Sequence, residues 1–575
     1  MQSLGGKVGR ITVLGALCVG VAAGSAACSS SGGPGEPTAS TGQAVTAAQI
    51  AHGQNIWLKA TFGGQIFFSL ILPGAPLNLP LGFGQVLTTP RSQRFTQWGV
   101  VNDPGCTDGN ALTGGLDICA NDTDPNDPEE PLFGEPSGVV GIRKFPNPIF
   151  NPQQPPSASN SPFIFGVSCA GCHAGLNPQN PPADPNNPGW ANIHLTTGNQ
   201  YINIGKIFGA NLSPNDPRYQ VFHTWAPGTV DTTAIENDGI NNPGIITQFY
   251  QFDDRPTFTV HQNGVLLNSF GVTNGVAHRA GQGGEDDVGC QLAATRVYFN
   301  IGMCAAECML PHLGTNPPAT QTPIDLAACA QACQFFDAEQ AEVGDMCAFI
   351  NDEGSTPVPS LIAAGGGQYV DLDDAHEGAK VFANNCAGCH SNHTSDDDYS
   401  DDLLHTASGF NPLIGEPPGD VGTNACRSLT TNWQGGAIWS AFGSDEKKAL
   451  GPGHYRDVPL FGIWATAPFF HNNRLGSFNN DPSLAGRIAA FTDAYNQLVN
   501  PWLRNELGSV QVTTAPITVN GITLPAGTPV AAFANLDLST GQLRCGDFVE
   551  NGGHYFGALL NPGQKHNLGE YLKTL

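Results

Sequence analysis

The sequence predicts a mainly α-helical protein with extensive irregular loops, and three observations lead to this expectation. Residues 375–385 and 565–575 have helix-like sequences. The 72 glycines and 45 prolines of the 575-residue chain favour loops elsewhere. The pentapeptide Cys-Ala-Gly-Cys-His occurs twice, at 169–173 and 386–390, and indicates two related units. A chain of this length also predicts two or three domains rather than one.

The first residues predict export from the cytoplasm. Lys7 and Arg10 precede an apolar run that contains small residues and is too short for a membrane span, so residues 1–27 are expected to be a signal peptide. Cys28 then opens a Ser/Gly-rich tether, residues 28–42, as at the start of a bacterial lipoprotein. We expect a protein of the periplasm of a Gram-negative bacterium, with a lipid anchor at Cys28 or a place on the cell surface as further expectations.

Ordinary cleavage of this signal is the alternative to acylation. Ser25 stands where lipoprotein signals usually carry Leu. Cleavage without acylation would release a soluble periplasmic protein.

The charge of the chain bears on its partners. The formal net charge is -26, from 23 basic and 49 acidic residues. Such an anionic surface argues against nucleic acid or an anionic lipid surface as a partner. A need for solubility outside the cell explains the negative charge without any partner.

Cysteine usage agrees with export. Of 16 cysteines, Cys18 and Cys28 belong to the export signal and four belong to the repeated pentapeptide, which leaves ten. An even number in an oxidising compartment predicts five disulfides. The expected pairs are Cys304–Cys333, Cys308–Cys329, Cys106–Cys119, Cys290–Cys347 and Cys426–Cys545.

The first two pairs rest on spacing. Cys304 and Cys308 are four residues apart, as are Cys329 and Cys333, so each pair shares one helix face. Two antiparallel helices in residues 290–350 can therefore be joined as a disulfide-stapled hairpin. Zinc is the alternative, disfavoured by the exported setting and by the lack of a suitably spaced His.

The repeated pentapeptide carries the strongest chemical signal. Two thiols at this spacing can add to the two vinyl groups of one haem, and the adjacent His then binds iron. The sequence therefore predicts two covalently bound haem c groups in two cytochrome c-like domains. Zinc, a thioredoxin-like redox pair and chance are the alternatives, which the duplication in an exported chain disfavours. The predicted haem-binding residues are Cys169, Cys172, His173, Cys386, Cys389 and His390.

The sixth iron ligand decides function, because an open position permits chemistry and a fixed one favours electron transfer. No methionine lies in the second domain, which excludes a His/Met pair there. We predict His554 as the distal ligand of the second haem, because its flanking glycines let the backbone approach a flat cofactor. His194 is the corresponding candidate for the first haem. Further candidates in the second domain are His393, His405, His454, His471 and His566.

Two segments resemble a known family. Residues 455–473 resemble the signature of the bacterial di-haem cytochrome c peroxidase superfamily, which includes the methylamine-utilisation di-haem enzyme and the di-haem rubber oxygenases. Residues 553–557, followed by 569–575, are most similar to the rubber-oxygenase branch, where a His at this place is the sixth ligand of the C-terminal haem. The resemblance covers the second domain well and the first haem domain loosely.

The resemblance implies a reactive first haem that binds peroxide or dioxygen, and a second haem that delivers electrons. It implies that Trp225 carries electrons between them and that His194 masks the reactive iron until reduction. A calcium ion would lie between the domains, held by Asn203 (or Asn199) and by the carbonyls of Thr466 and Pro468. Glu236 is the candidate acid/base for cleaving an oxygen–oxygen bond, with a surface salt bridge as its alternative.

The predicted domain order follows from these motifs. After the tether come an N-terminal extension (43–160), the first haem domain (161–289), the stapled hairpin (290–350) and a C-terminal cytochrome c domain (366–575). The expected function is a peroxidase-like di-haem oxidoreductase supplied by a small redox protein. The alternatives are an oxygenase that cleaves an apolar substrate with dioxygen and a non-catalytic electron-transfer lipoprotein.

Overall fold

We describe the fold from a computed structural model of the 575-residue chain. Contacts divide the chain into two compact units, residues 1–41 and 42–575, and all described residues lie in the second. The structure describes residues 46–74, 78–122, 132–155, 160–229, 259–262, 265–268, 302–312, 322, 326–351, 360–390, 404–406, 421–424, 454–456, 460, 462–519, 521–530, 532 and 546–575. Within them helix predominates over strand, which supports the mainly α expectation in its coarse form.

The N-terminal part of this unit is built on helices, with strands confined to small sheets. Its helices are α1 (Ala47–Lys59), α2 (Gly64–Ile66), α3 (Phe83–Thr88), α4 (Arg91–Trp98), α5 (Ala170–His173), α6 (Ile204–Gly209) and α7 (Pro217–His223). Its strands are β1 (Cys106–Thr107), β2 (Ile118–Cys119), β3 (Glu135–Pro136), β4 (Ile142–Pro146), β5 (Phe163–Val167), β6 (Gly175–Leu176) and β7 (Ile193–His194). Only β3, β4 and β5 form a three-stranded sheet, which is antiparallel.

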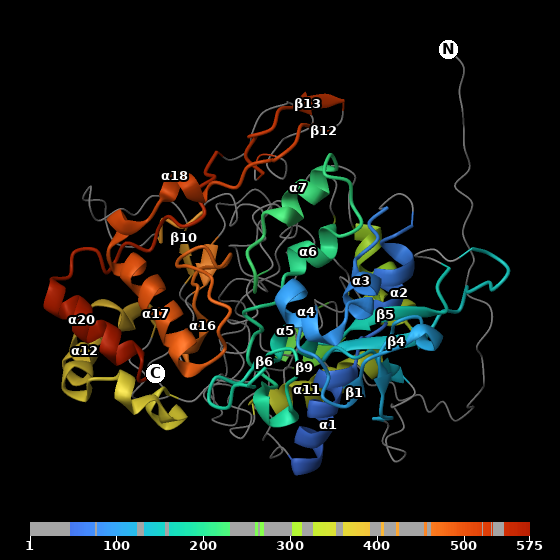
Figure 1. The fold of residues 1–575 in the computed structure, drawn as a ribbon, viewed down its shortest axis with the longest axis horizontal. Coiled ribbons are helices and arrows are strands. Elements are labelled where there is room, and N and C mark those ends of the chain that lie inside the picture. Colours follow the sequence, from blue (N-terminus) through green and yellow to red (C-terminus); the bar gives the residue numbers. More distant parts are fainter. Residues whose placement is uncertain are drawn as a thin grey trace, which may run out of the picture. The chain divides into compact units, whose positions relative to one another are not determined.

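Helix α1 packs against α11 (Phe336–Asn351), far along the chain (Figure 1). Thr46 and Gln49 start α1 with a capping box, which satisfies backbone donors of the first turn. Gly53 allows the close approach, because a Cβ there would lie 1.9 Å from the Asp345 carbonyl oxygen. His52 fixes the same crossing through its Nδ1 atom, 2.9 Å from Asp345 Oδ2. The packing therefore joins the predicted extension to the predicted hairpin region.

The predicted hairpin contains three short helical elements before α11. Residues Ala305–Met309 form a π-helical turn that continues as a 3-10 turn, Leu310–His312, and α10 spans Leu326–Ala332. Disulfides join Cys304 to Cys333 and Cys308 to Cys329, so both predicted staples are confirmed. The element that carries Cys304 and Cys308 is a short turn rather than a long helix.

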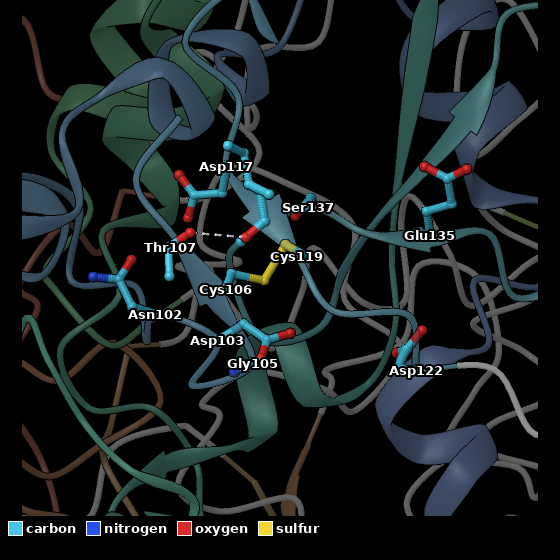
Figure 2. The surroundings of a disulfide bond; sticks show 12 residues. Asn102, Asp103, Gly105, Cys106, Thr107, Asp117, Cys119, Asp122, Glu135 and Ser137 are labelled. Atoms are coloured by element: carbon cyan, nitrogen blue, oxygen red, sulfur yellow. Dashed lines mark hydrogen bonds between the residues drawn. A yellow bond between two sulfur atoms is a disulfide. The ribbon is translucent and has the colours of Figure 1, made fainter. Parts of the chain in front are cut away.

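The third confirmed disulfide lies in the extension. Cys106 of β1 and Cys119 of β2 face one another in the antiparallel register and are bonded (Figure 2). The expected pairs Cys290–Cys347 and Cys426–Cys545 lie outside the residues whose side chains the structure describes, as do the signal peptide, Cys28 and the tether.

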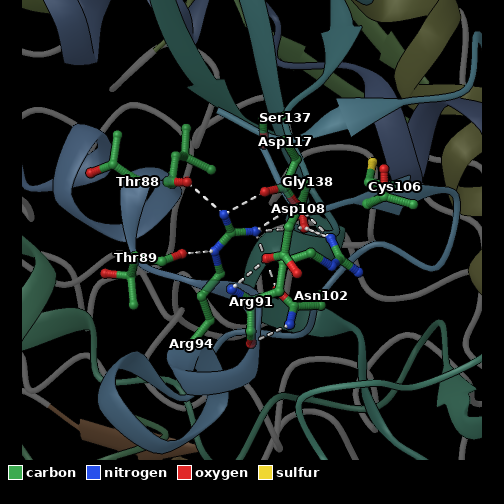
Figure 3. Close-up of polar contacts among 12 residues, drawn as sticks. Thr88, Thr89, Arg91, Arg94, Asn102, Cys106, Asp108, Asp117, Ser137 and Gly138 are labelled. Atoms are coloured by element: carbon green, nitrogen blue, oxygen red, sulfur yellow. Dashed lines mark hydrogen bonds and ion pairs between the residues drawn. The ribbon is translucent and has the colours of Figure 1, made fainter. Parts of the chain in front are cut away.

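A buried ion-pair cluster lies beside this disulfide. Both Asp117 oxygens accept hydrogen bonds, from Arg94 at 2.7 and 2.8 Å and from Arg91 at 2.5 Å (Figure 3). Arg94 Nε also donates to the Thr89 carbonyl. Asn102 donates to the Arg91 carbonyl, at the other side of the cluster. These charges are paired and hydrogen-bonded, as buried charges must be, and they tie α4 to the loops around it.

Helices dominate the C-terminal part as well. They are α12 (Leu372–Asn385), α13 (Ala387–His390), α16 (Ile463–Thr466), α17 (Leu484–Val499), α18 (Glu506–Ser509) and α20 (Pro562–Leu572), with short strand pairs β10 (Leu404–Thr406) with β11 (His454–Arg456) and β12 (Ile517–Val519) with β13 (Ile522–Leu524). One further strand pair, β8 (Thr259–Gln262) with β9 (Val265–Asn268), belongs to the middle of the chain. None of the described helices is long and apolar enough to cross a membrane.

The helices α12, α17 and α20 surround the C-terminal core (Figure 1). Asp371 begins α12 by accepting the backbone N–H groups of its first turn. Gly378 lets α12 cross α20 closely, because a Cβ there would lie 1.9 Å from the Asn567 carbonyl. Both helices extend a turn earlier than the sequence predicts and they position the second Cys-Ala-Gly-Cys-His segment.

Candidate haem-binding sites

The first Cys-Ala-Gly-Cys-His segment follows β5 and forms the single-turn helix α5. Cys169 stands at its N-terminus and accepts the backbone N–H of His173 at 2.9 Å. This turn brings the half-buried thiols of Cys169 and Cys172 and the buried His173 ring together. Gly141, at φ 75°, lets a neighbouring turn reach this helix, since a Cβ there would lie 2.0 Å from Gly171 N.

Apolar side chains from distant helices surround this turn. The Trp57 ring of α1 lies 5.8 Å from the His173 ring, and Met346 Sδ of α11 lies 3.6 Å from Cys169 Sγ. Burial raises the pKa of the Cys172 thiol to about 12. We did not predict Trp57 or Met346 from the sequence. The rarity of methionine could have pointed to Met346, which is one of only four methionines in the chain.

His194 lies next to the same segment. In the β6–β7 pair it stands directly opposite Gly175, which follows His173 by one intervening residue. Burial lowers the pKa of His194 to about 4, so its ring is neutral near pH 7. A neutral imidazole can bind a metal. The structure thus brings His194 to the first site, while its role as a distal ligand stays a prediction.

The second segment begins at the C-terminus of α12 and forms α13. The Cys386 N–H donates to the Phe382 carbonyl, and the His390 N–H donates to the Cys386 carbonyl at 3.0 Å. Cys386 is half-buried. The side chain of Cys389 lies outside the description. The turn repeats the geometry of α5, as the repeated sequence predicts.

His554 faces His390 at this second site. The centres of the two imidazole rings are 6.1 Å apart, with their planes tilted by 40°. Burial, with the neighbouring His390 and Arg504, lowers the pKa of His554 to about 3. Its Nδ1 is buried and has no hydrogen-bond partner among the described residues. The ring is therefore neutral and poorly satisfied by the protein alone.

These residues fit a haem iron. Metal–imidazole bonds are about 2 Å long, so two imidazoles on one metal place their ring centres about 6 Å apart. The observed 6.1 Å between His390 and His554 agrees with that spacing. The fit rests on the geometry of these two residues, one of which, His554, the sequence predicts as a ligand.

The other candidate histidines of the second domain have different surroundings. His566 is exposed, and its Nε2 lies 2.9 Å from Asp374 Oδ2. His471 is buried beside the signature segment, where its carbonyl accepts a bond from Thr229. His405 and His454 lie on β10 and β11, whose side chains are not described, and His393 lies outside the described residues.

Trp225 lies just before a loop that contacts the signature segment, residues 455–473. Its ring is buried against Phe222 and Phe208. Two groups of the following loop contact the signature segment: Thr229 Oγ1 donates to the His471 carbonyl at 3.0 Å, and the Pro227 carbonyl accepts from Asn473 at 3.2 Å. The structure therefore brings the loop after Trp225 to the signature segment. Glu236 lies outside the described residues.

Two of the predicted calcium residues, Asn203 and Thr466, use their side chains in other contacts. The Asn203 side-chain oxygen accepts the Lys206 N–H at the start of α6, and the Thr466 hydroxyl donates to the Ile463 carbonyl. The buried Arg487 guanidinium donates to the carbonyl of Ala467, between Thr466 and Pro468. A second cation beside it would be repelled. The surroundings thus fit calcium poorly, and the ion stays a prediction on which nothing below depends.

The other predicted calcium residue, Asn199, is fully used in hydrogen bonds that hold the chain near the first site. Its amide nitrogen donates to the Gly99 carbonyl at 2.9 Å, and its oxygen accepts the Tyr201 N–H. No group of three or more His, Cys, Asp or Glu side chains suited to a metal ion occurs in the described parts of the chain.

Comparison with known proteins finds no family model that matches this chain. No curated protein matches it either. The resemblance of residues 455–473 and 553–557 to the di-haem peroxidase superfamily therefore stays a hypothesis. The functional argument rests on the two sites themselves.

Proposed function

We propose that this chain is a di-haem c-type oxidoreductase with peroxidase-like activity. The observation that carries the proposal is the 6.1 Å spacing of the His390 and His554 rings beside a repeated haem-attachment sequence. Cys169 and Cys172 would hold one haem, and Cys386 and Cys389 the other, with His173 and His390 as proximal ligands. When bound, haem supplies the one-electron and oxygen chemistry that side chains lack.

The two haem sites would have different roles. His390 and His554 give the second site two fixed axial ligands, which suits electron transfer. The route for electrons toward the first site would pass near Trp225. The loop after Trp225 is hydrogen-bonded to His471 and Asn473, which directly follow Phe470. The ring of Phe470 lies 6.4 Å from that of His554. The donor would be a small redox protein in the same compartment.

The first site would reduce the substrate. One hydrogen peroxide molecule takes up two electrons and two protons to give two water molecules, so the site must admit protons as well as electrons. His194, neutral near pH 7, is the described residue beside this site that can bind iron or move a proton.

An oxygenase acting on an apolar substrate is the second candidate. The apolar side chains of Trp57, Met346 and Phe349 in the core around the first Cys-Ala-Gly-Cys-His segment favour it. Such a lining would suit a hydrocarbon better than a polar peroxide. In this case dioxygen, rather than peroxide, would be consumed.

Electron paramagnetic resonance and peroxide turnover test the proposal. The holoprotein should contain one six-coordinate haem that refuses carbon monoxide when reduced. With a reduced c-type cytochrome as donor, the half-reduced protein should consume peroxide and oxidise two donor molecules per peroxide. A stable dioxygen adduct without peroxide turnover would favour the oxygenase. If both haems are six-coordinate and react with neither peroxide nor dioxygen, the protein is an electron carrier without catalytic activity.

A further inference from the structure

The loop that carries His554 has a backbone conformation that needs support. Gly553 and His554 both have positive φ angles, 83° and 51°, and His is rarely found in this region. A Cβ at position 553 would lie 2.3 Å from Thr423 N, so the loop also passes very close to residues 421–424. The His554 N–H donates to the Val421 carbonyl at 2.5 Å. Holding this conformation costs free energy that other contacts must offset.

Arg504 supplies such contacts from behind the loop. Its Nη1 donates to the carbonyl of Gly553 at 2.6 Å and to that of Asn551 at 3.1 Å. Its Nε and Nη2 donate to the carbonyls of Gln497 and Leu498, at 2.8 and 2.9 Å, near the C-terminus of α17. One planar group thus joins the end of a rigid helix to the residue directly before His554.

The guanidinium is also fixed on its faces. Arg504 is 7% exposed, and its carbon Cζ lies 5.1 Å from the Tyr555 ring centre and 5.7 Å from that of Phe470. The Tyr555 hydroxyl is held in turn by Glu506, at 2.8 Å. Phe470 reaches the other side of the site, where its ring lies 6.4 Å from the His554 ring. These contacts leave Arg504 little freedom to move.

We propose that Arg504 is the positioning residue that holds His554 at bonding distance from the iron of the second haem. It acts through the backbone of Gly553 and not by contact with the cofactor. The inference deepens the proposed function and rests on it, because it presumes that His554 is an axial ligand. Without the hydrogen bonds from Arg504 to the loop carbonyls, the strained loop can relax and His554 can leave the iron.

For holding the loop, the planar shape of the Arg504 guanidinium is more important than its charge. Lysine keeps the charge but presents one nitrogen, which cannot reach carbonyls of the helix and of the loop at the same time in the same planar arrangement. Methionine removes both the charge and the donors. Comparing Arg504→Lys with Arg504→Met therefore separates the hydrogen-bond fork from the electrostatic effect of a nearby cation.

The experiment measures carbon monoxide binding by the reduced holoprotein, together with the resonance spectrum of the oxidised form. Loss of charged hydrogen bonds to the loop should raise the carbon monoxide-reactive fraction of the second haem by about tenfold or more in Arg504→Met. Arg504→Lys should behave more like Arg504→Met than like the unaltered protein. If Arg504→Met does not accumulate, Arg504→Lys alone decides the question.

Arg487→Lys is the matched control. Arg487 lies on α17, the helix whose last carbonyls Arg504 binds. It is 2% exposed and donates to the carbonyls of Ala467 and Asn479 rather than to the His554 loop. It should lose thermal stability without gaining carbon monoxide binding. The proposal is overturned if Arg504→Met, or Arg504→Lys in its place, keeps an unaltered spectrum and refuses carbon monoxide. If His554→Ala itself leaves the spectrum unchanged, the ligand assignment of the proposed function fails instead.

Discussion

The imidazole rings of His390 and His554 face one another with their centres 6.1 Å apart. They come from different elements of the C-terminal region, the single turn after α12 and the loop before α20. Each ring is positioned by its own backbone, by α13 for His390 and by a bond to Val421 for His554. This pair is the arrangement that two axial ligands of one iron require.

Replacing His554 by alanine should change one haem only. With the distal imidazole gone, the second iron should become five-coordinate, turn high-spin and bind carbon monoxide when reduced. Absorption and paramagnetic resonance spectra measure this. His566→Ala is the control, because His566 is exposed and pairs with Asp374. Equal spectra for His554→Ala and the unaltered protein would remove His554 from the axial role.

Each attachment sequence should account for one covalent haem. Cys172→Ala and Cys386→Ala should each reduce the covalently bound haem from two per chain toward one, because the thiols form the thioether bonds. Mass spectrometry of protein matured in a competent periplasm measures the added mass. The double variant Cys304→Ala/Cys333→Ala controls for general damage, since it breaks a disulfide away from the thiols. Unaltered protein with no added mass would refute both sites.

Asp117 should be important for stability and irrelevant to the haem spectra. Asp117→Ala leaves the buried guanidinium groups of Arg91 and Arg94 without their carboxylate, which should cost about 3–5 kcal/mol of unfolding free energy. Denaturant titration measures the loss. Glu135→Ala breaks the more exposed pair with Lys144 and should cost about 1 kcal/mol or less. Similar losses in the two variants would contradict this account of the cluster.

His194 should make stability depend on pH. Its pKa falls from the ordinary 6.5 to about 4 in the folded protein because burial disfavours the charged ring. The unfolded chain therefore binds the proton at higher pH. The stabilisation is fully present above pH 6.5, declines as the pH falls toward about 4, and amounts to roughly 2–3 kcal/mol.

The variant His194→Phe provides the comparison, since its ring cannot titrate. Unfolding free energies measured at intervals from pH 7 to pH 4 should fall less steeply for the variant than for the unaltered protein. Parallel curves would show that His194 is not held neutral in the folded state.

Chemistry that depends on neighbouring residues was predictable from the sequence. The two Cys-Ala-Gly-Cys-His segments both form single helical turns, in agreement with their identical five-residue sequences. The disulfides Cys304–Cys333 and Cys308–Cys329 followed from four-residue spacing, which places two thiols on one side of a helical turn.

Contacts between distant segments were harder to predict. Trp57 and Met346 carry no motif, and they reach the first site only because α1 and α11 cross at Gly53. Arg504 carries no motif either, and its importance follows from four carbonyls that the fold gathers around one guanidinium. Asn203, a candidate calcium residue, caps α6, because its side chain accepts the backbone N–H of Lys206.

The sequence by itself determined the local make-up of the two sites, since the repeated pentapeptide supplies two thiols and an imidazole at fixed spacing. Only the tertiary structure decided that the ring of His554, a candidate from the sequence, lies 6.1 Å from that of His390, and which side chains surround the two sites. His554 lies opposite His390, and Met346 lies beside Cys169, because packed helices and a supported loop bring them there. Side-chain proximity across long stretches of chain is a property of packing, and no local pattern encodes it.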